Sequence, residues 1–302
     1  LYLTPSNRED FFTFTRMLIG QLRQVGKTHT AERYVTVMNS FGRFRRENEL
    51  LWEEVDSDLM VEYETYLKSR GVCPNTSSYY MRGLRAIYNR AVEKGMTVQR
   101  EPFKYVYTGI DKTIKRAVPL KVIRQIRDLD LTLFPTMDFA RDIFMFSFYT
   151  RGMSFIDMAY LKKKDLQGGT LSYRRQKTGQ QLFVKWEKPM QEIVDKYNTN
   201  GTPYLLPIIR DMNADIRRQY KNAAHLVNDK LKKLGEKLGL TVPLTSYVAR
   251  HGWASIARSR NIPLAIISEA MGHDSEKTTR IYLASLDTTS VDKANSRILK
   301  AL

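Results

Sequence analysis

The stretch TSYVARHGWASIARSRNIPLAIISEAMGHDSEKTTRIYLASL, residues 245–286, contains Arg250, His273 and Tyr282 within a helical pattern. Tyr282 stands nine residues after His273, and the segment between Arg250 and His273 includes a helix that begins at a proline and ends at a glycine. A lone tyrosine is more often part of an ordinary helix stripe. Together with an arginine and a histidine on a basic chain, it indicates phosphate chemistry.

The chemistry of a phenol explains why cations are needed beside it. With a pKa of about 10 it is almost fully protonated at neutral pH, so its attack on phosphorus requires removal of the proton. The planar fork of an arginine neutralises the growing negative charge by holding two non-bridging oxygens at once. Each charge-assisted hydrogen bond contributes about 1.5–3 kcal/mol. A pocket of fixed cations would serve without a metal or another cofactor.

The composition predicts a polyanionic partner. The chain has 302 residues, 42% of them hydrophobic, which suits one or two ordinary cores. Its net charge is +17, of which +3 falls in residues 1–105 and +14 in residues 106–302. Double-stranded DNA is the first candidate, because Lys and Arg neutralise phosphates without a sequence code. A membrane surface is the weaker alternative, since no segment joins a long basic face to a clean apolar face.

Cysteine, histidine and hydropathy patterns indicate the compartment. No signal peptide or membrane-spanning run is apparent, which predicts a soluble cytoplasmic protein that is nucleoid-associated when bound to DNA. Cys73 is the single cysteine, so no internal disulfide can form, and four scattered histidines are too few for a dedicated zinc site. We therefore expect no metal and no cofactor.

Apolar periodicity predicts four helices in the first part of the chain. They cover residues 6–26, 28–47, 56–71 and 75–95. The fourth helix carries a basic stripe formed by Arg82, Arg85 and Arg90 on the side away from its apolar face. Such a stripe is as often solvated surface as a DNA contact, and both interpretations stay open.

A change in composition separates two domains. Residues 106–118 are interpreted as a linker between a helical domain, residues 1–105, and a second domain, residues 119–302. The basic residues of the linker are Lys112, Lys115 and Arg116. We expect them to contact DNA.

A β-hairpin interrupts the helices of the second domain. Leu171 and Tyr173 alternate with polar residues before the sequence KTGQ, and Leu182 and Val184 do so after it. Lys177 therefore stands in the turn of a small antiparallel sheet. Alone, a turn lysine is usually ordinary surface.

The pattern as a whole resembles the tyrosine recombinases, the phage-integrase family. In one box of that family, glycine-histidine follows an arginine after some twenty residues, and a tyrosine stands nine positions after the histidine. Arg250, the pair Gly272 and His273, and Tyr282 match this spacing. Lys177 matches the lysine that the family projects from a sheet turn, often in KTG.

The resemblance implies a fold and an activity. The implied fold is mainly α with a small antiparallel β-sheet: a helical SAM-like core-binding domain and a catalytic domain of the DNA-breaking-rejoining type. The implied enzyme is a cofactor-independent site-specific recombinase in which Tyr282 forms a 3′-phosphotyrosine intermediate. Lys177 would protonate the departing 5′ oxygen, while Arg250 and His273 would donate to phosphate oxygens. Integration, excision and inversion stay open as outcomes.

The first arginine box departs from the family pattern. RGMSFID, residues 151–157, has Ser154 where the family has its arginine. We expect Arg151 to supply the missing cation, because three residues earlier on a helix is the same face one turn away. Asp157 is expected to orient an arginine. A similar serine marks integrases from mobile elements of Bacteroides-type bacteria, which the chain resembles most.

A second departure lies three residues before Arg250. The family has a histidine there, and this chain has Tyr247, whose hydroxyl can support the site by hydrogen bonding but is a poor acid or base at neutral pH. His251 is more often a packing residue than a site residue at this position on a helix, and both interpretations stay open.

The resemblance also implies partners. Recombination needs four protomers around two duplexes, so a homo-tetramer is expected on paired sites, with the tail 283–302 docked on a neighbouring protomer. Accessory DNA-bending or directionality proteins are further candidate partners.

Three alternative functions stay open. A type IB topoisomerase shares the chemistry and relaxes supercoils without paired sites. A catalytically impaired DNA-binding regulator of recombination is compatible with Ser154 and Tyr247. A helix-turn-helix transcription factor would account for residues 260–273 but would leave Lys177 and Tyr282 unexplained.

Overall fold

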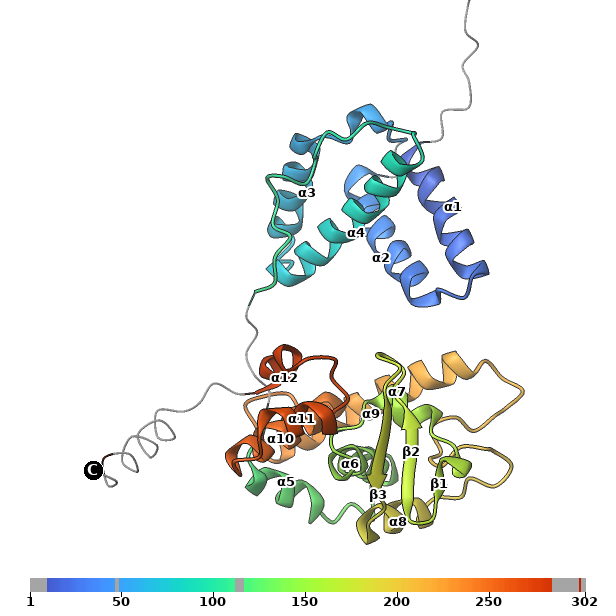
Figure 1. Ribbon diagram of the computed structural model, residues 1–302, viewed down its shortest axis with the longest axis vertical. Coiled ribbons are helices and arrows are strands. Elements are labelled where there is room, and N and C mark those ends of the chain that lie inside the picture. Colours follow the sequence, from blue (N-terminus) through green and yellow to red (C-terminus); the bar gives the residue numbers. More distant parts are fainter. Residues whose placement is uncertain (1–9, 47–48, 112–116, 284–298, 300–302) are drawn as a thin grey trace, which may run out of the picture. The chain divides into compact units, whose positions relative to one another are not determined.

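The computed structural model describes residues 10–46, 49–111, 117–283 and 299, except for the side chains of Ile281 and Tyr282. The chain forms two compact units, Leu1–Thr113 and Ile114–Leu302 (Figure 1). Lys112, Lys115, Arg116 and nearly all of the expected docking tail lie outside the described residues. None of the described helices is long and apolar enough to cross a membrane.

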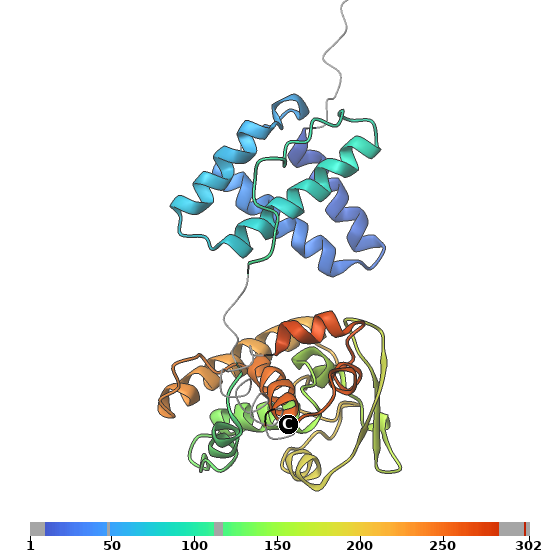
Figure 2. The ribbon, with the colours of Figure 1, turned by 60° about the vertical axis from the view of Figure 1, so that its left-hand side comes forward.

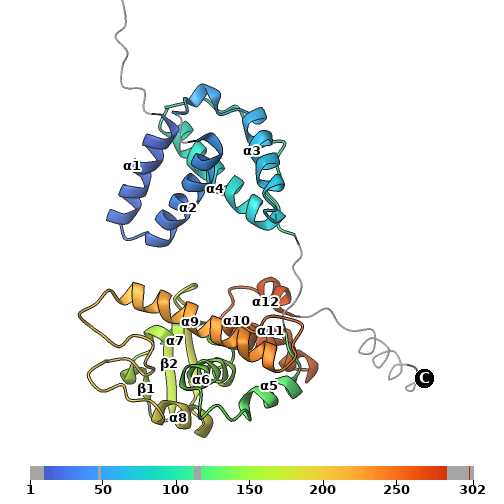
Figure 3. The same cartoon turned by 180° about the vertical axis from the view of Figure 1, so that it is seen from behind.

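The first unit is a bundle of helices with an aromatic core. Its elements are α1 (Phe11–Gln24), α2 (Thr28–Arg45), the 3₁₀ turn η1 (Trp52–Glu54), α3 (Ser57–Ser69) and α4 (Pro74–Glu93). Asp10 caps α1 by accepting from the backbone N–H of Thr13, and the helix gives way to Gly26 with a positive φ of 74°. Figures 1 and 3 show α2 between α1 and α4, with α3 beyond α4.

The segment after α4 is fastened to the first unit. The backbone N–H of Tyr107 donates to Glu64 Oε1 at 2.8 Å, and Asn75 exchanges two hydrogen bonds with the backbone of Asp111. Val106 is buried in the core of this unit, whereas Val118 is buried in the core of the second. The beginning of the segment interpreted as a linker therefore belongs to the first unit, and its end belongs to the second.

The second unit is built around one buried helix. Its helical elements are α5 (Leu120–Arg127), α6 (Pro135–Tyr149), α7 (Phe155–Tyr160), η2 (Lys163–Asp165), α8 (Lys188–Asp195), α9 (Ile216–Lys237), α10 (Ser246–Ser259), α11 (Leu264–Ala270) and α12 (Glu276–Tyr282). Four consecutive residues of α6, 143–146, are buried, which is typical of a helix enclosed on all sides. Helices α5, α8, α9 and α10 pack against it (Figure 1).

A three-stranded antiparallel sheet stands at one side of this unit (Figure 2). Its strands, in the order β1-β2-β3, are β1 (Leu166–Gln167), β2 (Thr170–Arg174) and β3 (Gln181–Lys185). Tyr173 pairs with Leu182, and the alternate residues of β2 and β3 are buried, as the alternation predicted. The hairpin prediction is confirmed. The short strand β1 was not expected.

Candidate active site

Arg250 is the buried centre of the candidate site. It lies on α10 with 3% of its surface exposed, and its Nη1 donates to the carbonyl of Gly152 at 2.5 Å. Its Nη2 donates to the carbonyl of Met271 at 2.6 Å. Gly152 has a φ of 77°, and a Cβ there would lie 2.8 Å from Arg250 Cα. Only glycine allows this loop to approach α10 so closely.

His273 connects Arg250 to α12. Its Nε2 lies 2.9 Å from Arg250 Nη2, and its Nδ1 lies 2.8 Å from the hydroxyl of Thr279 on α12. A guanidinium can only donate, so Nε2 is the acceptor and a neutral ring carries its proton on Nδ1. Burial, and then the charges of Arg250, Arg175 and Lys177, lower the pKa of His273 to about 3.

This geometry differs from the expected role of His273. We expected the imidazole to donate to a phosphate oxygen, but its described hydrogen bonds lead to Arg250 and Thr279. A neutral ring in this position orients a guanidinium. The imidazole is neutral because burial and three neighbouring cations favour its uncharged form.

Arg175 belongs to the same cluster and was missed by the sequence analysis. Only 4% of its surface is exposed, and its Nη1 donates to the carbonyl of Gly272, the residue before His273. The buried residues of β2 are Leu171 and Tyr173, and Arg175 is the next alternate position. A charge at a core-facing position was the signal that could have revealed it.

Lys177 is exposed in the hairpin turn that follows Arg175. The turn closes through hydrogen bonds from the N–H of Arg175 to the carbonyl of Gln180 and from the N–H of Gly179 to the carbonyl of Arg175. The charge of Lys177 is one of those that lower the pKa of His273. We define the cation cluster as Arg175, Lys177 and Arg250 around His273.

The loop before α7 corrects two expectations. Arg151 is half-buried and has a left-handed φ of 62°, and Ser154 is the N-cap of α7, so the two do not share a helical face. Asp157 does not bind an arginine in the described contacts. Its Oδ2 accepts from the Ser154 hydroxyl at 2.5 Å and its Oδ1 accepts from the Gln176 N–H at 2.9 Å. The carboxylate therefore joins α7 to the hairpin turn.

Two other predicted residues contact each other. Tyr247 and His251 lie on α10, and their rings meet edge to face with centroids 4.9 Å apart. Tyr247 is 49% exposed. Tyr282 is the last residue of α12, three positions after Thr279, and its side chain lies outside the described part.

The expected DNA-contacting arginines of the first unit lie on α4. Arg85 is exposed, Arg82 and Arg90 are half-buried, and Arg82 Nε donates to the carbonyl of Ser78 at 3.4 Å. Their DNA contact stays a prediction.

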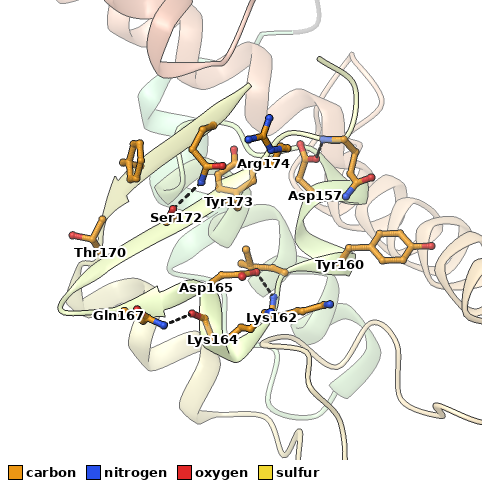
Figure 4. A pocket seen from close by; sticks show the side chains of 14 residues that line it. Asp157, Tyr160, Lys162, Lys164, Asp165, Gln167, Thr170, Ser172, Tyr173 and Arg174 are labelled. Atoms are coloured by element: carbon orange, nitrogen blue, oxygen red, sulfur yellow. Dashed lines mark hydrogen bonds between the residues drawn. The ribbon is translucent and has the colours of Figure 1, made fainter. Parts of the chain in front are cut away.

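A pocket of about 660 Å³ lies on the outer side of the sheet, beside α7. In Figure 4 Thr170 lies toward one end of it and Asp157 toward the other, with Tyr173 between them. Arg250, His273 and Lys177 do not line it. The pocket and the cation cluster both include residues of the hairpin, but the residues of the cation cluster do not line the pocket. Among the described residues, no three His, Cys, Asp or Glu side chains could together hold a metal ion.

Sequence comparison identifies relatives along most of the chain. The profile of the Phage integrase SAM-like domain matches residues 10–110, and that of the Phage integrase family matches residues 135–289. Tyrosine recombinase XerA of Pyrococcus horikoshii is 23% identical over 263 residues, which cover 76% of this chain and 90% of the relative. Tyrosine recombinase XerC of Syntrophus aciditrophicus is 25% identical over 282 residues, which cover 85% and 87%.

Solved structures share the fold. A lambda integrase dimer bound to a COC′ core site has a TM-score of 0.67 at 14% identity, with 88% of this chain and 96% of that chain covered. The Tn1549 transposon integrase in complex with a circular intermediate DNA has a TM-score of 0.67 at 16% identity, with 96% and 99% covered. The expected fold class is confirmed. With family profiles on both units and Xer relatives along most of its length, the chain belongs to the phage integrase family and is a tyrosine recombinase, an enzyme of site-specific DNA recombination.

Proposed function

We propose that Tyr282 cleaves duplex DNA by attacking a phosphodiester beside the cation cluster. The Tyr282 oxygen forms a bond with phosphorus while the bond from phosphorus to the 5′ oxygen breaks. The phenol loses its proton, and the departing 5′ oxygen gains one. The 3′-phosphotyrosyl ester conserves the energy of the original ester, so a 5′-hydroxyl of another strand reseals the DNA by the reverse step without a cofactor.

The hydrogen-bonded chain from Arg250 through His273 to Thr279 is the observation that carries this proposal. It links a buried guanidinium to α12, and Tyr282 follows Thr279 by three residues on that helix. The cation that would hold the phosphate and the backbone that bears the phenol are thus connected through a single imidazole.

The burial and hydrogen bonds of the polar residues suggest a separate role for each of them. Arg250 holds the non-bridging oxygens, since its buried fork is strongest in a low-dielectric site. Lys177, exposed in the hairpin turn, protonates the 5′ oxygen. His273 stays neutral and positions Arg250. Tyr247 supports the site through its hydroxyl, and Arg151 remains the alternative second cation.

The partners follow from the same chemistry. We propose double-stranded DNA as substrate, with Arg82, Arg85 and Arg90 among its contacts, and a tetramer on paired sites. A lambda integrase tetramer bound to a Holliday junction shares the fold, with a TM-score of 0.64. Accessory directionality proteins, an exchanged tail, a Bacteroides-type mobile-element branch and a bacterial cytoplasm with nucleoid association complete the proposal.

Covalent trapping tests the proposed function. The probe is a nicked suicide duplex that carries the sequence which the protein enriches from a random duplex library. Wild type should leave a protein–DNA adduct that survives denaturation, and Tyr282→Phe should bind the duplex equally well and leave none. Specific binding without an adduct would instead indicate the DNA-binding regulator. Supercoil relaxation on plasmids without paired sites would indicate the topoisomerase.

A further inference from the structure

The loop before α7 leaves one cation of the proposed site unaccounted for. By its resemblance to the tyrosine recombinases the chain has Ser154 where the family pattern has arginine, and the Ser154 hydroxyl is engaged with Asp157. A pentacoordinate phosphate carries charge on two non-bridging oxygens, which a single guanidinium and an exposed lysine only partly neutralise. A second cation is therefore expected, and the described residues around this loop offer two candidates, Arg151 and Arg175.

Arg175 is buried without a compensating charge. Its Nη1 donates to the carbonyl of Gly272, and its buried Nε has no hydrogen-bond partner among the residues that the structure describes. Among the described residues, Arg175 also forms no ion pair with a carboxylate. Burying a cation and an N–H donor in this way is unfavourable unless an anion arrives to pair with them.

The position of Arg175 complements that of Arg250. Arg250 bonds the carbonyl of Met271, and Arg175 bonds that of the next residue, Gly272, so two guanidiniums from different elements hold consecutive carbonyls beside His273. A Cβ on Gly272 would lie 3.1 Å from Arg175 Cδ, which shows how closely this loop covers the side chain. The arrangement is built into the fold rather than left to a flexible surface residue.

Arg151 has a weaker claim on geometry. It is half-buried on a left-handed turn, and it makes no side-chain hydrogen bond within the described part of the chain. Burial and Asp157 raise the pKa of Tyr173, and Arg250, Arg175 and Arg151 oppose this in decreasing order. Arg175 and Arg250 also act on His273, whereas Arg151 does not.

We infer that Arg175 is the second phosphate-binding guanidinium of the site, taking the place of the arginine that Ser154 replaces. This inference rests on the proposed function. Arg175 and Arg250 would each pair with a non-bridging oxygen of the phosphate that Tyr282 attacks, and the orphaned Nε of Arg175 would gain its acceptor from the substrate.

Removal of charge from the substrate tests this role. Two suicide duplexes are compared, one with a normal phosphate and one with an uncharged methylphosphonate at the cleaved position. Adduct formation by Arg175→Ala, Arg151→Ala and wild type is measured on both at saturating protein. Arg174→Ala is the matched control, since it removes the same charge from the adjacent, exposed position.

We expect Arg175→Ala to react at least 100-fold more slowly than wild type on the phosphate and less than 10-fold more slowly on the methylphosphonate. Arg174→Ala and Arg151→Ala should show the same ratio to wild type on both duplexes. An Arg175→Ala deficit that is equal on both would mean a merely structural role and would overturn the inference. The inference would also be overturned if Arg151→Ala, and not Arg175→Ala, reacted much more slowly than wild type on the phosphate but not on the methylphosphonate.

Folding of the variants is checked by thermal unfolding. If Arg175→Ala does not fold, Arg175→Gln is measured in its place, because glutamine also removes the charge while it keeps a long polar side chain, and the same ratio decides. If wild type leaves no Tyr282 adduct, the proposed function fails and the inference falls with it. If wild type reacts and Arg175→Ala reacts equally well, the inference alone fails.

Discussion

Two groups of charged side chains in the second unit each surround a buried centre, Asp142 in one and Arg250 in the other, and they differ in how their charge is compensated. In the first group Asp142 accepts from Arg141 Nε at 2.6 Å, from Lys196 Nζ at 2.8 Å and from the Tyr197 hydroxyl at 2.7 Å. Asp138 pairs with the same two cations. Two carboxylates thus meet two cations, and burial together with Asp142 raises the pKa of Tyr197, which keeps its hydroxyl a donor.

The cation cluster has a different composition. Its described hydrogen bonds lead to backbone carbonyls and to a neutral imidazole. The carboxylate of Asp157 is engaged with Ser154 and Gln176 instead. A compensated group is complete as it stands and fastens α6 to the end of α8. A group with surplus positive charge is suited to a ligand that supplies the anion.

The largest expected effect separates catalysis from binding. Arg250→Ala should slow adduct formation about 100- to 1000-fold, or about 3–4 kcal/mol, because the charge it stabilises develops in the transition state. Duplex affinity, measured by gel shift, should change less than about threefold. Arg258→Ala, an exposed arginine on the same helix, is the control. Equal losses of binding and cleavage would reject the assigned role.

The compensated group should respond in stability instead. Asp142→Asn leaves Lys196 and Arg141 short of a partner and should lower the free energy of unfolding by about 3 kcal/mol, measured by urea denaturation. Asp128→Asn, in the exposed pair with Arg127, should leave the midpoint unchanged. Cleavage per folded Asp142→Asn molecule should equal that of wild type. If Asp142→Asn lost cleavage but not stability, the compensated group would not be the purely structural one that we infer.

The pH dependence of stability should reveal the imidazole. The pKa of His273 is about 3 in the folded protein and about 6.5 when unfolded, so the unfolded state binds the proton first as pH falls. The stability that this residue contributes is present above pH 6.5 and declines below it. The loss should be about 2 kcal/mol between pH 6.5 and pH 5. His273→Gln should flatten this part of the urea-midpoint profile, and an unaltered slope would contradict the assignment.

The smallest effect concerns the cap of α7. Ser154→Ala removes the N-cap and a hydrogen bond to Asp157, which should cost about 1 kcal/mol in the free energy of unfolding. Ser154→Thr keeps a hydroxyl and should restore most of it. Adduct formation by Ser154→Ala should fall far less than that by Arg175→Ala. If adduct formation fell more in Ser154→Ala than in Arg175→Ala, the loop before α7 and not Arg175 would be the more important for cleavage.

The sequence predicted what depends on local patterns. The helices of the first unit, the hairpin and the fold class follow from apolar periodicity and from the resemblance, and they are confirmed. Motif spacing placed Arg250 and His273 in one site, but the hydrogen bond between them was not expected. The role of Arg175 depended on a contact with Gly272, 97 residues away, which no local pattern specifies.

The helix assumed at Arg151 was wrong for a physical reason. We assumed a continuous helix through residues 151–157, but α6 ends at Tyr149 and the left-handed backbone of Arg151 and Gly152 turns the chain before Ser154 caps α7. Gly152 was the local sign of this break, since its close approach to Arg250 excludes a Cβ. Spacing on an assumed helix therefore misplaced the side chain.

The hydrogen bond between His273 and Thr279 has a consequence for the assembled enzyme. If α12 moves away, for example to serve another subunit, Thr279 leaves with it and the imidazole must find a new partner for Nδ1. The ring that orients Arg250 then loses one of its two anchors. Under the proposed function, movement of the backbone that carries Tyr282 would therefore also loosen Arg250, the guanidinium proposed to hold the phosphate.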